Sequence, residues 1–421
     1  MSKMKTTFAA LAAAAVMATS AVAGSHSAPL TGDLRIFLDT SNPAPRATME
    51  AMIERFAAEH PDLNIETTVI DREAYKTQIR NFLTANSPDV ATWYAANRMR
   101  PYVEAGLFED VSDLWMEPEI AENLASTKGA MTIDGKQWGV PYTYYQWGVY
   151  YREDIFAQYG LTEPSTWEEE KANCQTLLDN GVKCYTIGTK FLWTAGGWFD
   201  YLNMRTNGFD FHMQLAGGDI PWTDDRVRAT FANWAELIEM GAFIDNHATY
   251  SWQEALPFMV QGDAAAYLMG NFAVAPLRDA GLSDDQLGFY QFVEITPGIE
   301  KSEDAPTDTF HIPAGAQNKE AAREFLRFVV SADEQTVINN GSNLGQLPVN
   351  AMSSVDNDEF LNEGFEMLSS NSPGGVAQFW DRDAPAEMAK ASMEGFQEFM
   401  VRPGNLDAIL NRLERVRQRV Y

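Results

Sequence analysis

The run from Asp33 to Tyr94 alternates between two hydrophobic patterns, and this alternation constrains the fold more than any other feature of the chain. Apolar residues at every second position predict short strands, whereas apolar residues at i, i+3, i+4 and i+7 predict helices. In chain order the pattern predicts strand Asp33–Leu38, helix Arg46–His60, strand Asn64–Ile70, helix Glu73–Asn86 and strand Asp89–Tyr94. This β-α-β-α-β order predicts a parallel, wound sheet.

The carboxyl ends of those strands are where a wound sheet binds ligands. Thr40, Ser41 and Asn42 follow the first strand, and Trp93 and Tyr94 end the third. These five positions are therefore candidate ligand contacts.

An unusually aromatic stretch, Pro141–Phe156, lies in the middle of the chain. Within ten positions it holds Tyr142, Tyr144, Tyr145, Trp147, Tyr150 and Tyr151. Thr143–Val149 favours an extended conformation, because β-branched and aromatic residues fit a pleated surface. Two interpretations stay open: a buried strand in a large core, or a strand that crosses between two lobes and lines the cleft between them. Flat rings with a polar tip suit sugar faces, so the second interpretation places Tyr144 and Tyr145 among the candidate contacts.

A chain of 421 residues exceeds one hydrophobic core, which predicts two domains. Leu287–Ile295 and Asn343–Pro348 are two further segments able to cross between them.

The first 23 residues have the pattern of a cleaved signal peptide. Lys3 and Lys5 precede the apolar run Phe8–Ala18, and Ala21-Val22-Ala23 forms a small-x-small cleavage site. The apolar run is too short to span a bilayer, so we expect export without membrane insertion.

In an oxidising compartment Cys174 and Cys184 could form a disulfide; the alternative is two buried free thiols.

Several classes of function find no support in the sequence. A formal net charge of −28 argues against nucleic-acid and anionic-membrane partners, which require basic patches. The five histidines show no metal-ligand spacing, and no phosphate loop, dinucleotide fingerprint or Gly-x-Ser-x-Gly motif occurs. We therefore expect no metal, no cofactor and no catalysis.

A set of short segments, in order along nearly the whole chain, resembles a known family. The segments are Phe56–Glu66, Ser87–Val90, Pro141–Tyr142, Gly148–Phe156, Pro164–Glu169, Gln261–Ala266 and Lys319–Leu326. Together they resemble the bacterial extracellular solute-binding proteins of carbohydrate ABC importers, in the maltose-binding-protein class.

The resemblance implies a two-lobed α/β fold of the type II periplasmic-binding-protein kind. Each lobe is a wound, mostly parallel sheet flanked by helices, and hinge strands join the lobes. We expect one lobe to comprise 30–141 plus 289–345 and the other 142–288 plus 346–421. The resemblance also implies a periplasmic monomer that closes on a small carbohydrate and is read by the permease subunits of the importer.

The resemblance adds candidate site residues in the second lobe. It matches Trp198 in a glycine-rich segment, Asn271 and Phe272 after Gly270, and Trp380 followed by Asp381 and Arg382. At Trp93 and Tyr94 many relatives carry an acidic residue. From the residues themselves, Trp193 lies in a loop near glycines, and Arg46 and Arg382 could hold an anionic group.

Two functions follow from these observations. The first is a periplasmic sugar-binding protein without catalysis. The alternative is a secreted glycoside hydrolase, which would need two carboxylates about 5–10 Å apart across a cleft.

Overall fold

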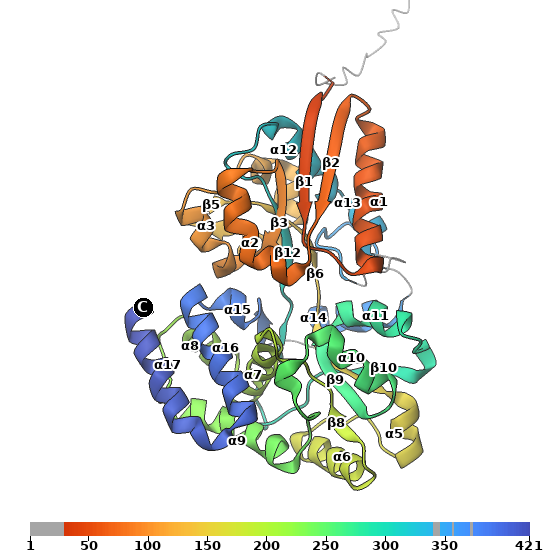
Figure 1. The fold of residues 1–421 in the computed structure, drawn as a ribbon, viewed down its shortest axis with the longest axis vertical. Helices are drawn as coiled ribbons and strands as arrows, with labels where there is room; N and C mark the ends of the chain where they lie inside the picture. Colours follow the sequence, from red (N-terminus) through yellow and green to blue (C-terminus); the bar gives the residue numbers. More distant parts are fainter. Residues whose placement is uncertain (1–28, 340–345, 356–357, 371–373) are drawn as a thin grey trace, which may run out of the picture.

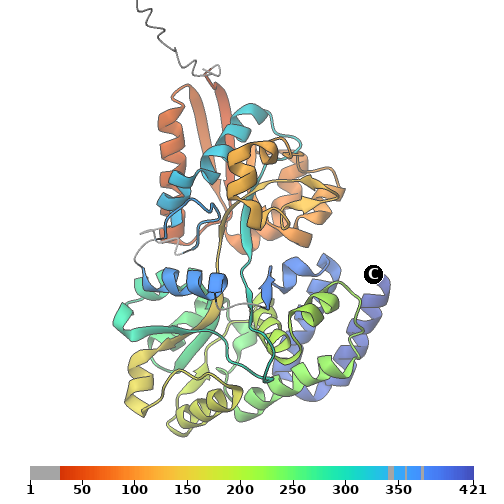
Figure 2. The ribbon, with the colours of Figure 1, turned by 180° about the vertical axis from the view of Figure 1, so that it is seen from behind.

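Two lobes, each built on its own sheet, make up the computed structural model, which describes residues 29–339, 346–355, 358–370 and 374–421 (Figures 1 and 2). The predicted signal peptide, 1–23, and the Asn343–Gly345 part of one predicted crossing lie outside the described residues. The type II α/β architecture that the sequence predicted is confirmed.

The lobe at the top of Figure 1 is called the upper lobe, and its sheet has the strand order β2-β1-β3-β12-β6. Its strands are β1 (Gly32–Leu38), β2 (Leu63–Val69), β3 (Val90–Tyr94), β6 (Val140–Tyr144) and β12 (Thr307–His311). β1 runs parallel to both β2 and β3, as the β-α-β-α-β pattern predicted, while β12 is antiparallel to β3 and β6.

Helices α1 (Pro43–Glu59) and α2 (Arg72–Ala85) begin where local chemistry favours a helix start. Proline is tolerated in the first turn, where its missing N–H would have no partner. The Asp71 carboxylate caps α2 by accepting hydrogen bonds from the Glu73 and Ala74 amides. α2 then buries Tyr75, Ile79 and Leu83 on one face, which fixes its first turn at the edge of the sheet.

The lower sheet has the strand order β10-β7-β9-β8. Its strands are β7 (Trp147–Arg152), β8 (Lys183–Tyr185), β9 (Ala264–Gly270) and β10 (Leu287–Tyr290). β8 and β9 are parallel, and β7 is antiparallel to both β9 and β10. In each sheet one strand thus opposes the others: β12 above and β7 below.

The remaining elements cover these sheets or join them. The upper lobe adds α3 (Arg100–Glu104), α4 (Pro118–Asn123), β4 (Thr132–Ile133), β5 (Lys136–Gln137), α12 (Lys319–Val330) and α13 (Ala332–Asn339). The lower lobe adds α5 (Glu153–Tyr159), α6 (Trp167–Asp179), α7 (Trp193–Asn207), α8 (Phe209–Ala216), α9 (Asp225–Met240), α10 (Trp252–Val260), α11 (Val274–Asp279), β11 (Ser302–Asp304), α14 (Glu359–Ser370), β13 (Gly375–Ala377), α15 (Trp380–Asp383), α16 (Ala386–Val401) and α17 (Leu406–Val420).

The aromatic stretch Pro141–Phe156 does cross between the lobes. It forms two strands rather than one: β6 pairs in the upper sheet, β7 pairs in the lower sheet, and Tyr145 and Gln146 connect them. Tyr142 accordingly belongs to the upper core, whereas Tyr145 and Trp147 belong to the lower core.

The segment Leu287–Ile295 does not cross, contrary to the sequence-based expectation. Its first part, β10, pairs with β7 at the edge of the lower sheet, and Val293 still belongs to the lower core. The chain returns to the upper lobe later, between β11 and β12, and Phe310 lies in the upper core. This segment begins as an edge strand of the lower sheet, and all four residues of β10 are buried. Phe289 and Val293 therefore belong to the lower lobe and not to the predicted upper-lobe segment 289–345. The other residue bounds of the two lobes stay a prediction.

Candidate ligand-binding pocket

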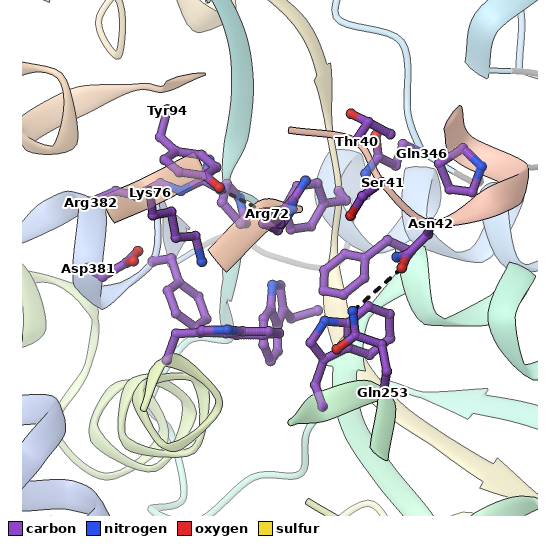
Figure 3. A pocket seen from close by; sticks show the side chains of 18 of the residues that line it. Thr40, Ser41, Asn42, Arg72, Lys76, Tyr94, Gln253, Gln346, Asp381 and Arg382 are labelled. Atoms are coloured by element: carbon purple, nitrogen blue, oxygen red, sulfur yellow. Dashed lines mark hydrogen bonds between the residues drawn. The ribbon is translucent and has the colours of Figure 1, made fainter. Parts of the chain in front are cut away.

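A pocket lies between the lobes, and both contribute to it (Figure 3). It encloses about 860 Å³ not filled by protein atoms, open solvent at its mouth included. Its lining residues are Thr40, Ser41, Asn42, Pro45, Arg72, Lys76, Tyr94, Tyr142, Tyr145, Trp147, Trp193, Trp252, Gln253, Phe272, Pro306, Gln346, Phe379, Asp381 and Arg382.

The upper wall of the pocket is largely polar. Thr40, Ser41 and Asn42 follow β1, while Arg72 and Lys76 extend from the first two turns of α2. These positions lie together because the carboxyl ends of parallel strands and the helices that follow them share one edge of a wound sheet. The upper wall therefore offers hydroxyl, amide and cationic groups.

The lower wall is aromatic. Trp193 and Trp252 open α7 and α10, Phe272 follows β9, and Trp147 comes from β7. The Trp252 and Phe272 rings meet edge to face with centroids 5.3 Å apart, and Trp147 meets Trp193 in the same way at 5.9 Å. Such pairs hold one another's orientation, so this wall is a rigid apolar surface.

Arg382 is buried and uses its donors within the protein. Its guanidinium donates to the Thr307 carbonyl at 2.6 Å, the Tyr145 hydroxyl at 2.7 Å and Asp308 Oδ1 at 2.9 Å. It also lies 4.7 Å from the centroid of the Tyr94 ring. Burial alone would lower the pKa of Arg382, but the neighbouring Tyr145 and Asp308 raise it above its ordinary value. Arg382 thus positions the pocket wall.

Arg72 and Lys76 are less fully engaged. The Arg72 guanidinium lies 3.6 Å from Asp39 and 3.5 Å from Asp308, both longer than a normal hydrogen bond. Lys76 pairs with Glu73 at 2.9 Å, and its ammonium lies 5.9 Å from the centroid of the Trp193 ring in the other lobe. Burial lowers the pKa of Lys76 from its ordinary value, which Glu73 opposes. Arg72 retains donor capacity for a ligand.

Polar contacts join the two walls around the pocket. The Gln253 amide donates to Asn42 Oδ1 at 3.5 Å, as the dashed line in Figure 3 shows. On another side, Arg98 pairs with Asp381 at 3.7 Å and the Asn97 amide donates to the Asp383 carbonyl at 2.7 Å. The lobes therefore meet across the pocket through side chains that a hinge motion would separate.

The structure brings many of the sequence-predicted site residues into the pocket. These are Thr40, Ser41, Asn42, Tyr94, Tyr145, Trp193, Phe272, Asp381 and Arg382. Whether each contacts a ligand stays a prediction.

Three predicted tryptophans lie in the cores instead. Trp93 alternates with Tyr94 along β3 and so points to the opposite face, where its indole N–H donates to the Arg98 carbonyl at 3.0 Å. Trp198 follows Trp193 by five residues on α7, about 140° around the helix, and is fully buried. Trp380 is also fully buried, with its indole N–H donating to Ser392 Oγ at 2.6 Å. As placed, none of the three offers a surface to the pocket.

Arg46, Tyr144 and Asn271 lie near the pocket but do not line it. Arg46 is exposed on α1 and pairs with Glu50 at 2.8 Å. Tyr144 ends β6, and burial raises the pKa of its hydroxyl to about 12. Asn271 is buried beside Phe272, and its side-chain amide finds no hydrogen-bond partner in the described part of the chain.

The other residues that line the pocket were not predicted, although the sequence around some of them indicated a candidate position. Tyr142 and Trp147 lie in the aromatic stretch that was singled out, and Trp252 follows the capping-box residue Ser251 at a helix start. Arg72, Lys76 and Gln253 lie on ordinary amphipathic helices, where the sequence does not distinguish a pocket residue from a solvated one. The remaining lining residues that were not predicted are Pro45, Pro306, Gln346 and Phe379.

Cys174 of α6 and Cys184 of β8 form the expected disulfide. Within the described ranges, His, Cys, Asp and Glu side chains do not gather into groups of three or more that could hold a metal ion. None of the described helices combines the length and apolar character needed to cross a bilayer.

Comparison with known proteins identifies the family. The family model of the bacterial extracellular solute-binding proteins matches residues 40–336. That match covers well over half of the chain, so the protein belongs to this extracellular family. Its members serve ABC transporters as binding proteins.

Similar proteins cover most of the chain at low identity. An uncharacterized ABC transporter extracellular-binding protein of Pyrococcus horikoshii is 24% identical over 70% of this chain and 67% of its own length. The multiple sugar-binding protein of Streptococcus mutans is 26% identical over 68% of each chain. The solved structure of the bacterial solute receptor AcbH superposes with a TM-score of 0.85 at 24% identity, covering 93% of this chain and 99% of that one.

Proposed function

We propose that this protein captures a sugar or sugar derivative in the pocket between its lobes and delivers it to the permease of an ABC importer, working in the periplasm as a monomer. The division of chemistry between the two pocket walls carries the proposal. A sugar ring has apolar C–H faces ringed by hydroxyls. The Trp193, Trp252 and Phe272 rings suit its faces, while the Ser41, Asn42 and Arg72 side chains suit its hydroxyls.

The contacts between the walls support capture by closure. Arg98–Asp381, Asn97–Asp383 and Asn42–Gln253 join opposite lobes around the pocket. A ligand that contacts both walls binds the closed state more tightly than the open state and so favours closure. A permease can then recognise the closed conformation. The name of the Streptococcus mutans relative, a multiple sugar-binding protein, agrees with this class of ligand.

The first test is a thermal-shift screen against a carbohydrate library, followed by titration calorimetry on the sugars that stabilise the protein. A free ligand concentration of about 100 times the Kd should raise the free energy of unfolding by ~2.7 kcal/mol. Absence of stabilisation and of heat with every sugar would contradict the proposal.

Trp193→Ala is the variant that tests the pocket itself. We expect a loss of about 2–4 kcal/mol of binding free energy, because an aromatic anchor in a pocket carries a large share of affinity. Trp138→Ala is the matched control: Trp138 is also partly buried but lies in the upper lobe outside the pocket. Equal affinities for wild type and Trp193→Ala would place the ligand elsewhere.

Incubation with mixed glycosides distinguishes binding from hydrolysis. Among the described residues that line the pocket, Asp381 is the only one with a carboxylate side chain, and it is paired with Arg98. A hydrolase needs two carboxylates facing the scissile bond. We expect no released sugar; release that Asp381→Asn abolishes would favour the hydrolase.

A further inference from the structure

A second groove lies next to the pocket. It lies between the start of α2 in the upper lobe and the start of α10 in the lower lobe, with the segment before α7 on one side. About 720 Å³ of it, open solvent included, is free of protein atoms. Arg72, Trp252 and Gln253 line both the pocket and this groove, so the two spaces are adjacent.

Aromatic rings lead from the pocket into the groove. Trp193 and Trp252 meet with centroids 6.5 Å apart, and Phe191 lies two residues before Trp193. Phe191 is 39% exposed, whereas most large hydrophobic side chains in the described part of the chain are buried. A ring stacked on Phe191 would remove this apolar surface from water, and Trp252 would contact ligand in both spaces.

The polar lining of the groove indicates the charge of its occupant. Asp71, Glu73, Glu254, Arg72 and Lys190 line the groove, and Lys76 pairs with Glu73 at 2.9 Å, so the carboxylates and cations balance. Glu254 is half exposed and lies 3.8 Å from Lys190, whose ammonium is 5.5 Å from the centroid of the Phe191 ring. This balanced lining offers no excess cation to an anionic group, whereas hydroxyls can both donate to the carboxylates and accept from Lys190.

We propose that this groove is an outer subsite for a second, neutral sugar ring, so that the ligand is a disaccharide or longer glycoside rather than a monosaccharide. The inference rests on the proposed function. The first ring occupies the pocket against Trp193 and Phe272. The second stacks on Phe191, and its hydroxyls bond to Lys190 and Glu254.

The test compares matched sugars of increasing length. Glucose, maltose and maltotriose form one series, galactose, melibiose and raffinose a second, and xylose, xylobiose and xylotriose a third. Titration calorimetry on wild type should give a disaccharide that binds at least about tenfold more tightly than its monosaccharide, as one added aromatic contact allows. Phe191→Ala should erase this preference and change monosaccharide affinity less than about twofold.

Two further variants separate the subsite from general effects. Phe191→Tyr retains a ring and should retain the preference. Phe365→Ala removes another half-exposed phenylalanine outside both spaces and should leave all affinities unchanged. A monosaccharide that binds as tightly as its disaccharide, or an equal loss for both in Phe191→Ala, overturns the outer subsite while the proposed function stands. Failure of every sugar to bind overturns both.

Discussion

The two walls of the pocket differ in chemistry because they come from different parts of their lobes. The upper wall is formed by the loop after β1 and the first turns of α2, where side chains such as Ser41 and Arg72 are polar. The lower wall is formed by β7 and the starts of α7 and α10, which present Trp147, Trp193 and Trp252. A ligand with both apolar and hydroxylated surfaces is the kind that contacts both walls well, and neither lobe alone surrounds it.

The same contrast appears within one helix, and it supplies the prediction with the largest expected effect. Trp193 faces the pocket, whereas Trp198 is fully buried in the lower core, against Tyr185, Phe243 and Phe292. We expect Trp198→Ala to lose about 3–5 kcal/mol of unfolding free energy, because it leaves a cavity in a packed core. Trp193→Ala should lose mainly affinity. Urea unfolding measures the first effect and calorimetry the second.

An opposite outcome would be informative. If Trp198→Ala kept its stability but lost binding, the assignment of Trp198 to the core rather than to the pocket would fall. Trp234→Ala, another fully buried tryptophan of the lower core, serves as the stability control.

The lobes also differ in their buried carboxyl groups, which gives a second prediction. In the described part of the chain, the carboxyl groups whose pKa is raised all belong to the lower lobe: Glu170, Asp200, Asp304, Glu363 and Asp383. Burial raises the pKa of Glu170 to about 8, and hydrogen bonds from the Tyr185 and Tyr290 hydroxyls hold its carboxyl group.

The sign of the pH effect follows from that raised pKa. Between the ordinary glutamate pKa of about 4.5 and pH 8, the folded state keeps a proton that the unfolded state has released. Stability should therefore fall as pH rises through this window and level off above it. Glu170→Gln should flatten the dependence of Tm on pH between 5 and 8. Glu168→Gln, an exposed change on the same helix, should leave it as steep as in wild type. An unaltered slope in Glu170→Gln would contradict the prediction.

The smallest expected effect concerns a single bridge between the walls. The Asn42–Gln253 hydrogen bond is long, at 3.5 Å, and exposed. Removing it with Gln253→Ala should weaken sugar binding by about 0.5–1 kcal/mol, measured by calorimetry. Asn42→Ala combined with Gln253→Ala should cost no more than the larger single change if their mutual contact is what matters. Fully additive losses would instead mean that each side chain contacts the ligand separately.

Much of the fold could be predicted because its signals are local. The strand and helix ends between Asp33 and Tyr94 agree with the structure to within about three residues, since alternation, helical spacing and caps act over a few positions. The disulfide was predicted because the leader pattern indicates export of Cys174 and Cys184 to an oxidising compartment, and the structure contains it. The edge strand at Leu287–Tyr290 was misread as a crossing, because its pattern fits either role.

By itself the sequence determined the wound sheets, the family and the aromatic richness of the pocket region. The tertiary structure decided which aromatic residues face the pocket. Alternation along a strand shows that Trp93 and Tyr94 lie on opposite sides. The sequence indicated a loop at Trp193, and only the structure places Trp193 and Trp198 on different sides of one helix, α7. Whether a given side meets a core or an opening depends on elements far away in the chain, such as Phe243 and Phe292 packed against Trp198.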